Sequence, residues 1–172
     1  MMEADVPRVV AIESCWDYLS KWGEAGYLRV LREPGLFCPL VAEVESSGEL
    51  SGAETGTLAG VAVLALMFDH GELCNLMVPP RYLGKRVGQR LLTQCLEVAR
   101  QRHLPRIFLE VRHSNHRAIC FYRRNGFQII SRRRNYYRNP LEDAWVMERP
   151  AAKGSLPTVG SRALKEMGNP PR

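Results

Sequence analysis

Hydrophobic positions in the first part of the chain recur every three to four residues, which is the spacing of one helix face. The pattern runs from Val6 to Arg32, and Gly23 and Gly26 divide it into two pieces. Pro34 and Pro39 follow and predict the end of the helical region. We therefore expect two short helices at the start of the fold.

The rest of the chain alternates short apolar runs with helical patterns. The predicted strands are 40–44, 58–68, 73–78, 107–111, 127–133 and 144–149. A helix over 88–102 joins the third strand to the fourth, so these two strands should lie parallel. A later helix begins at Ser114 or Asn115 and ends at Gly126. This order predicts an α+β (mixed α/β) fold, with a mobile polar loop over 46–56.

Length and composition predict one domain. The chain has 172 residues, of which 45% are hydrophobic, so residues 1–150 can bury a core of their own. After Pro150 the chain is rich in Gly, Pro and Ser, and we expect 151–172 to be a disordered tail. No apolar run approaches the ~20 residues that cross a bilayer, and the start MMEADVPR lacks the pattern of a secretion signal. We therefore expect a cytoplasmic protein without membrane contact.

The cysteines are odd in number and none forms a C-x-x-C pair, which argues against a disulfide framework or a metal cluster. We interpret them as small buried hydrophobic residues. They are Cys15, Cys38, Cys74, Cys95 and Cys120.

A net charge of +6 and arginine clusters such as 132–134 could indicate nucleic-acid binding. A solvated basic face is the more usual explanation, and no nucleic-acid fold or interleaving of aromatic with basic residues is evident. We therefore expect no direct nucleic-acid binding.

A basic loop with glycines stands between the strand over 73–78 and the next helix. It contains Gly84, Lys85, Arg86 and Gly88, and the main-chain amides at the helix start would face an anion. Such loops are common, so the loop alone is a weak indication of a phosphate site.

Four segments in order, VPPRYLGKRVGQRLL, FLEVRHSNHRAICFYRRNGF, RRNYY and EDAWVM, resemble the GCN-related N-acetyltransferases (GNAT). Within that family they are most similar to the bacterial enzymes that acetylate the N-terminal alanine of a ribosomal small-subunit protein. The resemblance covers 73–147 closely and the earlier part only loosely. It implies a mixed central sheet that splays open between two parallel strands and is flanked by helices. It also implies acetyl-CoA as acetyl donor, with no metal.

The family motif V-x-P-x-(Y/F)-(Q/R)-x-x-G-x-(G/A), which wraps the pyrophosphate of coenzyme A, is matched at Val78, Pro80, Tyr82 and Gly88. The chain departs from it at Leu83 and Arg86; Arg86 stands where relatives have a glycine that lets backbone approach phosphate. By resemblance, the cofactor-binding residues are Leu76, Met77, Val78, Gly84, Lys85, Arg86, Val87, Gly88, Gln89 and Asn115. Asn115 could equally serve as a helix cap.

Acetylation of an amine needs a proton acceptor, because an N-terminal amine with a pKa near ~8 is mostly protonated at neutral pH. Glu110 lies in a strand where Leu109 and Val111 face the other way, and the resemblance makes it the proton acceptor. The alternatives for Glu110 are an ion pair with Arg112 or an outward solvated position.

The departing thiolate needs a proton donor, and Tyr122 matches the family's donor by position. The alternative is a core tyrosine with a hydrogen-bonded hydroxyl. We expect direct transfer in a ternary complex without an acyl-enzyme, because no cysteine has a plausible base partner nearby in the sequence. Cys120 is the nearest rival nucleophile.

Three functional hypotheses remain open. The first is acetylation of the N-terminal alanine of ribosomal small-subunit protein eighteen. The second is a related enzyme that acts on another protein N-terminus, a lysine or a small amine. The third is a non-catalytic binding module, which the departures from the pyrophosphate motif keep possible. Aromatic residues that could line an acceptor groove or pack in the core are Trp16, Tyr18, Trp22, Tyr136 and Tyr137. The oligomeric state is left open.

Overall fold

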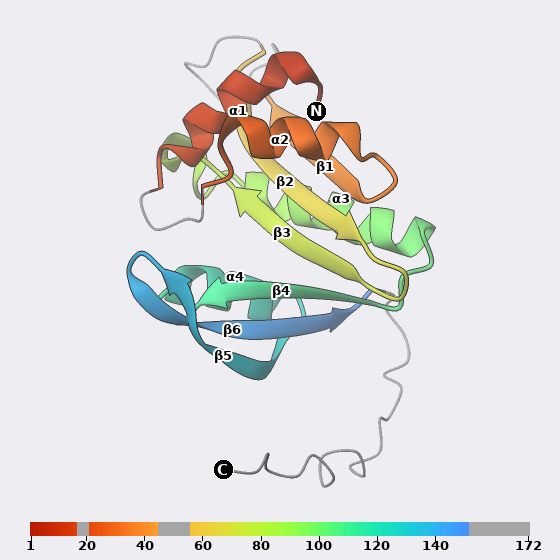
Figure 1. Cartoon of the computed structure of the whole chain (residues 1–172), viewed down its shortest axis with the longest axis vertical. Helices are drawn as coiled ribbons and strands as arrows, with labels where there is room; N and C mark the ends of the chain where they lie inside the picture. Colours follow the sequence, from red (N-terminus) through yellow and green to blue (C-terminus); the bar gives the residue numbers. More distant parts are fainter. Residues whose placement is uncertain (17–20, 45–55, 152–172) are drawn as a thin grey trace, which may run out of the picture.

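The computed structural model describes residues 1–16, 21–44 and 56–151. Within these residues six strands form one sheet in the order β1-β2-β3-β4-β6-β5 (Figure 1). The strands are β1 (Phe37–Glu43), β2 (Leu58–Leu66), β3 (Gly71–Met77), β4 (Arg106–Arg112), β5 (Gln128–Arg138) and β6 (Leu141–Pro150).

Helices cover both faces of the sheet (Figure 1). The helices are α1 (Val6–Glu13), α2 (Gly23–Arg32), α3 (Val87–Gln101) and α4 (His116–Arg124), with single 3-10 turns at Glu3–Asp5 and Pro80–Tyr82. On one face α1 and α2 pack on inward residues of β2 and β3, such as Val61, Val63 and Met77. On the opposite face α3 and α4 pack on the alternate residues, such as Leu64 and Leu109. The two apolar faces therefore follow the alternation of side chains along each strand.

β3 and β4 are the parallel neighbours, as the crossover helix α3 predicts. Their pairing is limited to Gly71 with Ile107 and Glu72 with Phe108. Beyond these two pairs the strands diverge, and the sheet splays into a half of β1–β3 and a half of β4–β6 (Figure 1). The expected splay between parallel strands is confirmed.

The predicted helices and strands are confirmed, with differences at their ends. Asn115 is the N-cap of α4, and Gly126 has a φ of +84°, the left-handed value expected just after a helix. β1 includes Pro39, and β5 and β6 extend beyond their predicted ends to pair as a hairpin as far as Arg138 with Leu141. Long-range pairing with a neighbouring strand, rather than the local pattern, extends these strands.

The interpretation of the cysteines is wrong for two of them. Cys95 is buried, and Cys38 and Cys74 are half-buried, but Cys15 and Cys120 are exposed. In α4 the buried side chains are Ile119 and Tyr122, so Cys120 falls on the outer side of the helix.

Two predictions lie outside the described residues: most of the mobile loop, because 45–55 are not described, and the tail from 152 onward. Among the helices that are described, none has the length and apolarity needed to span a membrane.

Candidate active site

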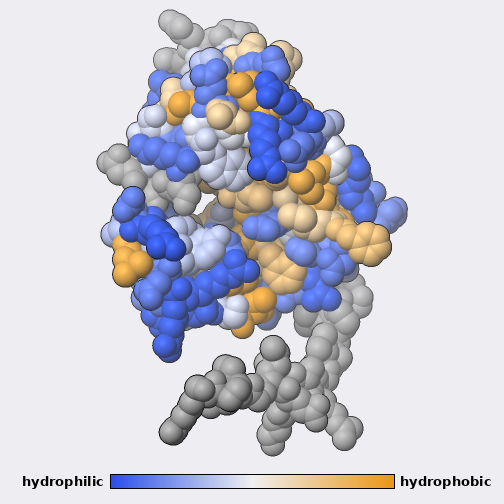
Figure 2. All heavy atoms as spheres, in the orientation of Figure 1, coloured by the Kyte–Doolittle hydropathy of each residue, from blue (hydrophilic) through white to orange (hydrophobic). Residues whose placement is uncertain are grey.

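A cavity of about 280 Å³ opens where β3 and β4 diverge. Figure 2 shows the molecular surface hollowed between the two halves of the sheet. The cavity lining includes both predicted catalytic residues, Glu110 and Tyr122. The lining residues are Trp22, Glu72, Leu73, Cys74, Asn75, Leu76, Glu110, Val111, Arg112, Asn115, Ala118, Tyr122, Tyr136 and Tyr137.

Glu110 enters the cavity from β4, just beyond the last residue paired with β3. Leu109 and Val111 are buried on the helix-covered face, so alternation along the strand turns Glu110 to the other side. Its side chain is 14% exposed and forms an ion pair with Arg133 of β5. Burial, followed by a hydrogen bond to the Glu110 carboxylate, raises the pKa of the Tyr136 hydroxyl. Glu110 is therefore largely shielded from solvent, and its carboxylate is paired with the Arg133 guanidinium.

Arg112 holds the β5–β6 hairpin against the cavity. Its guanidinium donates to the main-chain oxygen of Asn139 at 2.9 Å and to Glu142 Oε2 at 3.2 Å. It also lies 4.0 Å from the centre of the Tyr137 ring. Arg112 is 6% exposed, so these contacts replace the water that a cation loses on burial. They place Tyr136 and Tyr137 at the cavity wall.

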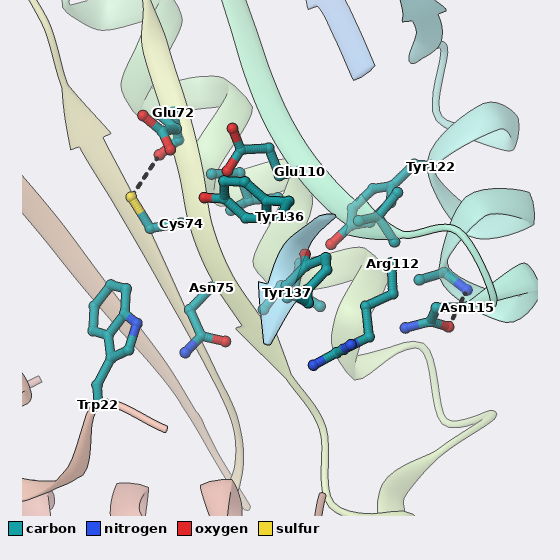
Figure 3. A pocket seen from close by; sticks show the side chains of 14 residues that line it. Trp22, Glu72, Cys74, Asn75, Glu110, Arg112, Asn115, Tyr122, Tyr136 and Tyr137 are labelled. Carbon is teal, nitrogen blue, oxygen red and sulfur yellow. Dashed lines mark hydrogen bonds between the residues drawn. The ribbon is translucent and has the colours of Figure 1, made fainter. Parts of the chain in front are cut away.

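Tyr122 faces the cavity from α4 (Figure 3). Its ring packs edge-on between Phe121 and Phe127, with ring centres 5.3 and 5.6 Å away. Burial, with smaller contributions from Cys95 and Tyr137, raises the pKa of its hydroxyl. The Tyr122 hydroxyl therefore keeps its proton at neutral pH.

Asn115 caps α4 and also borders the cavity. Its side-chain oxygen accepts a hydrogen bond from the Ala118 amide at 3.1 Å. The preceding Ser114 amide donates to Glu142 Oε1 at 2.5 Å, which joins the helix start to the β5–β6 hairpin. Capping is thus one role of Asn115, and contact with the cofactor stays a prediction.

The basic loop lies at the start of α3, on the helix side of the splay. Gly88 approaches the end of β3, since a Cβ placed on it would lie 3.6 Å from both Leu76 and Val78. Gln89 Nε2 donates to Asn125 Oδ1 at 2.7 Å, linking the start of α3 to the end of α4. Arg86 has a φ of +60°, a left-handed conformation that glycine adopts more readily. Arg86, which stands where relatives have a glycine, therefore still adopts the left-handed backbone conformation at this position of the loop.

Of the predicted cofactor set, Leu76 and Asn115 line the cavity, while Met77 and Val78 are buried at the end of β3. Gly84, Lys85, Arg86, Val87, Gly88 and Gln89 form the loop and the first turn of α3, outside the cavity lining.

Sequence reasoning missed Glu72, Cys74 and Asn75 of β3, which also line the cavity. Residues three apart point to opposite faces of a regular strand, but a bulge after Leu73 makes Glu72 and Asn75 face the same way. The sequence signal that could have identified Asn75 is that a polar residue interrupts the apolar run LCNLMV.

Of the aromatic residues that could line an acceptor groove, Trp22, Tyr136 and Tyr137 line the cavity, and Tyr18 lies outside the described residues.

A second cavity of about 310 Å³ adjoins the first and shares Glu72, Glu110 and Tyr136 with it. It also contacts Phe108 and Val146, which belong to the half of the sheet formed by β4–β6. Glu110 therefore borders two adjoining cavities, so an acetyl donor and an acceptor amine could each enter through a different one.

The thiol of Cys74, which lines the first cavity, is unsuited to carry an acetyl group. Burial, followed by the negative charge of Glu72, raises the pKa of Cys74 to about 12, so a thiolate is rare at neutral pH. Cys120 is absent from the lining of either cavity. Among the residues that the structure describes, no group of three His, Cys, Asp or Glu side chains could hold a metal ion.

Comparison with known proteins agrees with this geometry. The model of the acetyltransferase (GNAT) family matches residues 11–127, and the chain belongs to this family. It is an acetyltransferase.

A Bacillus subtilis protein, provisionally named a [ribosomal protein bS18]-alanine N-acetyltransferase, is 30% identical over 143 residues, which are 83% of this chain and 87% of that protein. The [ribosomal protein bS18]-alanine N-acetyltransferase of Escherichia coli K12 is 34% identical over 99 residues, 56% of this chain and 67% of that protein.

Solved structures show the same architecture. The crystal structure of the ribosomal-protein-S18-alanine N-acetyltransferase from Escherichia coli superposes with a TM-score of 0.73 at 25% identity, covering 90% of this chain and 93% of that one. Ard1 from Thermoplasma volcanium gives a TM-score of 0.75 at 25% identity, covering 89% and 95%.

Proposed function

We propose that this acetyltransferase transfers the acetyl group of acetyl-CoA to the N-terminal alanine of ribosomal protein bS18. The main observation behind the proposal is that one cavity contains both Glu110 and Tyr122, an acceptor and a donor of protons. The names of the relatives supply the acceptor, because two of those compared above are named for the alanine of bS18. A ribosomal substrate places the reaction in the cytoplasm.

Glu110 takes a proton from the incoming ammonium group, either directly or through a water molecule. Its carboxylate is already paired with a cation, Arg133, whose side chain is 58% exposed. Because the guanidinium of Arg133 lies on the solvent side of this pair, it can move out into water, and an N-terminal ammonium can take its place. The same carboxylate thus binds the acceptor and deprotonates it.

Tyr122 donates a proton to the departing sulfur. Bound acetyl-CoA supplies the acetyl thioester, and the Tyr122 hydroxyl faces the cavity with its proton retained by a raised pKa. A donor that stays protonated at the working pH is available in every turnover. Transfer is direct, since the Cys74 thiol, with a pKa of about 12, is a poor nucleophile.

The chain has a suitable place for the phosphates of acetyl-CoA. The first-turn amides of the 15-residue helix α3 point toward the loop that carries Lys85 and Arg86. Gly88 is in this first turn and brings it close to the end of β3, because a Cβ added there would lie 3.6 Å from the side chains of Leu76 and Val78. The diverged edge of β3 from Cys74 to Val78 offers main-chain groups to the pantetheine arm.

The decisive experiment follows thiol release from acetyl-CoA with three acceptors: a peptide with a free N-terminal alanine, the same peptide with a blocked N-terminus, and a blocked peptide containing lysine. We expect turnover with the free alanine only, and its loss in Glu110→Gln. Turnover with the lysine peptide instead would move the acceptor to another amine. Release with none of them would refute the proposed reaction.

A further inference from the structure

A network of buried and partly buried hydrogen bonds leads from α1 to the cavity wall. Glu13, the last residue of α1, is 2% exposed. Its carboxylate accepts from the Trp22 amide at 2.7 Å, from the Gly23 amide at 3.0 Å and from the Tyr27 hydroxyl at 3.0 Å. The Tyr27 oxygen in turn accepts from Asn75 Nδ2 at 3.1 Å. These hydrogen bonds thus join α1 and α2 to β3 at Asn75, which lines the cavity.

The direction of each hydrogen bond follows from chemistry. A carboxylate can only accept, so Tyr27 must donate its one proton to Glu13. Burial and the charge of Glu13 raise the pKa of Tyr27, so that proton stays in place. The Tyr27 oxygen is then an acceptor, and the Asn75 amide must turn its NH₂ group toward it. The Asn75 carbonyl oxygen is thereby directed to the other side.

That other side is the cavity. Figure 3 shows the Asn75 oxygen on the side of Tyr137 and Arg112, with the nitrogen turned away from them. Asn75 comes from β3 and Glu110 from β4, the two strands that diverge around the cavity. A group bound between these strands therefore meets a carboxylate on one side and an amide oxygen on the other.

We propose that the Asn75 side-chain oxygen accepts a hydrogen bond from the acceptor amine, and that Tyr27 and Glu13 are positioning residues that keep this oxygen aimed at the amine. The inference rests on the proposed function, since it concerns the same amine. After Glu110 has taken one proton, the primary amine keeps two N–H groups. An amide oxygen is too weakly basic to remove either, so it orients the nitrogen lone pair without competing with Glu110.

The alternative is a purely structural role for the polar chain, in which it only ties α1 and α2 to the sheet. Both roles predict some loss of stability when Tyr27 loses its hydroxyl. They differ in kinetics, because only the proposed role changes the KM of the acceptor while leaving the KM of acetyl-CoA unchanged.

The test uses the full chain with Asn75→Leu, Tyr27→Phe and the double variant. Gln101→Leu is the matched control, since Gln101 is an exposed amide on α3 that bonds only to Glu97 among the described contacts. Peptide KM, acetyl-CoA KM and melting temperature are measured for each. Tyr27→Phe keeps the buried ring and removes only the hydroxyl, so it serves if Asn75→Leu fails to fold.

We expect each single variant to raise the KM of the alanine peptide about tenfold, the loss of one substrate hydrogen bond, with acetyl-CoA KM within twofold of wild type. The double variant should be no worse than Asn75→Leu, because Tyr27 acts through Asn75. The Gln101→Leu control should leave both KM values unchanged.

An unchanged peptide KM in folded Asn75→Leu, or an equal rise in both KM values, would overturn the inference while the proposed function stands. Additive effects in the double variant would overturn the positioning role of Tyr27. A wild-type protein that acetylates no amine would instead refute the proposed function, and the inference with it.

Discussion

Gly60 of β2 lies where α3 packs closely on the sheet, and adding one methyl group there should destabilise the protein. A Cβ at this position would lie 2.9 Å from the Met77 carbonyl oxygen, 2.9 Å from Leu91 Cδ1 and 3.0 Å from Val87 Cγ1. The two methyl groups can turn aside. The carbonyl cannot, because Met77 pairs with the neighbouring Val61 in the β2–β3 ladder.

Gly60→Ala must therefore push α3 or β3 outward, at the cost of overpacking. Such changes cost about 1–3 kcal/mol, so we expect the free energy of unfolding to fall by about 2 kcal/mol. For a chain of this size that corresponds to a melting temperature about 4–8 °C lower. Urea unfolding and thermal melting followed by circular dichroism measure both quantities.

Gly88→Ala is the matched control, because its Cβ would make only ordinary contacts, at 3.6 Å or more. The free energy of unfolding of Gly88→Ala should stay within about 0.5 kcal/mol of wild type. The KM of this variant for acetyl-CoA should rise about tenfold, because the proposed phosphate site is at the start of α3. Equal stability of Gly60→Ala and wild type would refute the close packing at Gly60. A wild-type acetyl-CoA KM in Gly88→Ala would refute the phosphate site.

Three further predictions concern the site and its support. Glu110→Gln should lower kcat about 10²–10⁴-fold with little change in melting temperature, and steady-state kinetics with a melting curve checks both parts. Tyr122→Phe should lower kcat and leave the KM of acetyl-CoA unchanged. In the wild type, kcat/KM should rise with pH up to the amine pKa near ~8. It should then stay level to about pH 10, because the pKa of Tyr122 is raised. A fall in kcat/KM between pH 8 and 10 would contradict this assignment. Burial pushes the pKa of Glu142 up, but hydrogen bonds from Ser114 and Arg112 outweigh it and leave the pKa lowered. The stability that Glu142 contributes is therefore fully present above its unfolded pKa of about 4.3 and is lost as pH falls through the lowered folded value. Urea unfolding between pH 3 and 7 should show a shallower acid loss in Glu142→Gln than in wild type, and parallel curves would contradict the ion pair with Arg112.

Local sequence patterns are enough to predict the order of helices and strands and the parallel relation of β3 to β4. Apolar periodicity, the Asn115 cap and the left-handed Gly126 are local signals, and each acts within a few residues of the position that it specifies. The direction of Glu110 also follows locally, from alternation between Leu109 and Val111. The catalytic roles of Glu110 and Tyr122 are predictions from the family resemblance.

The set of side chains that meet in the cavity depends on long-range packing. The bulge that turns Glu72 and Asn75 to one face depends on the register between β2 and β3. The ion pair of Glu110 with Arg133 depends on β5 lying beyond β6, far from Glu110 in the chain. Register and strand order are set by the packing of the whole sheet, whereas local patterns specify only which face of each strand is apolar. The sequence therefore gives the elements that build the site, and long-range packing determines their contacts.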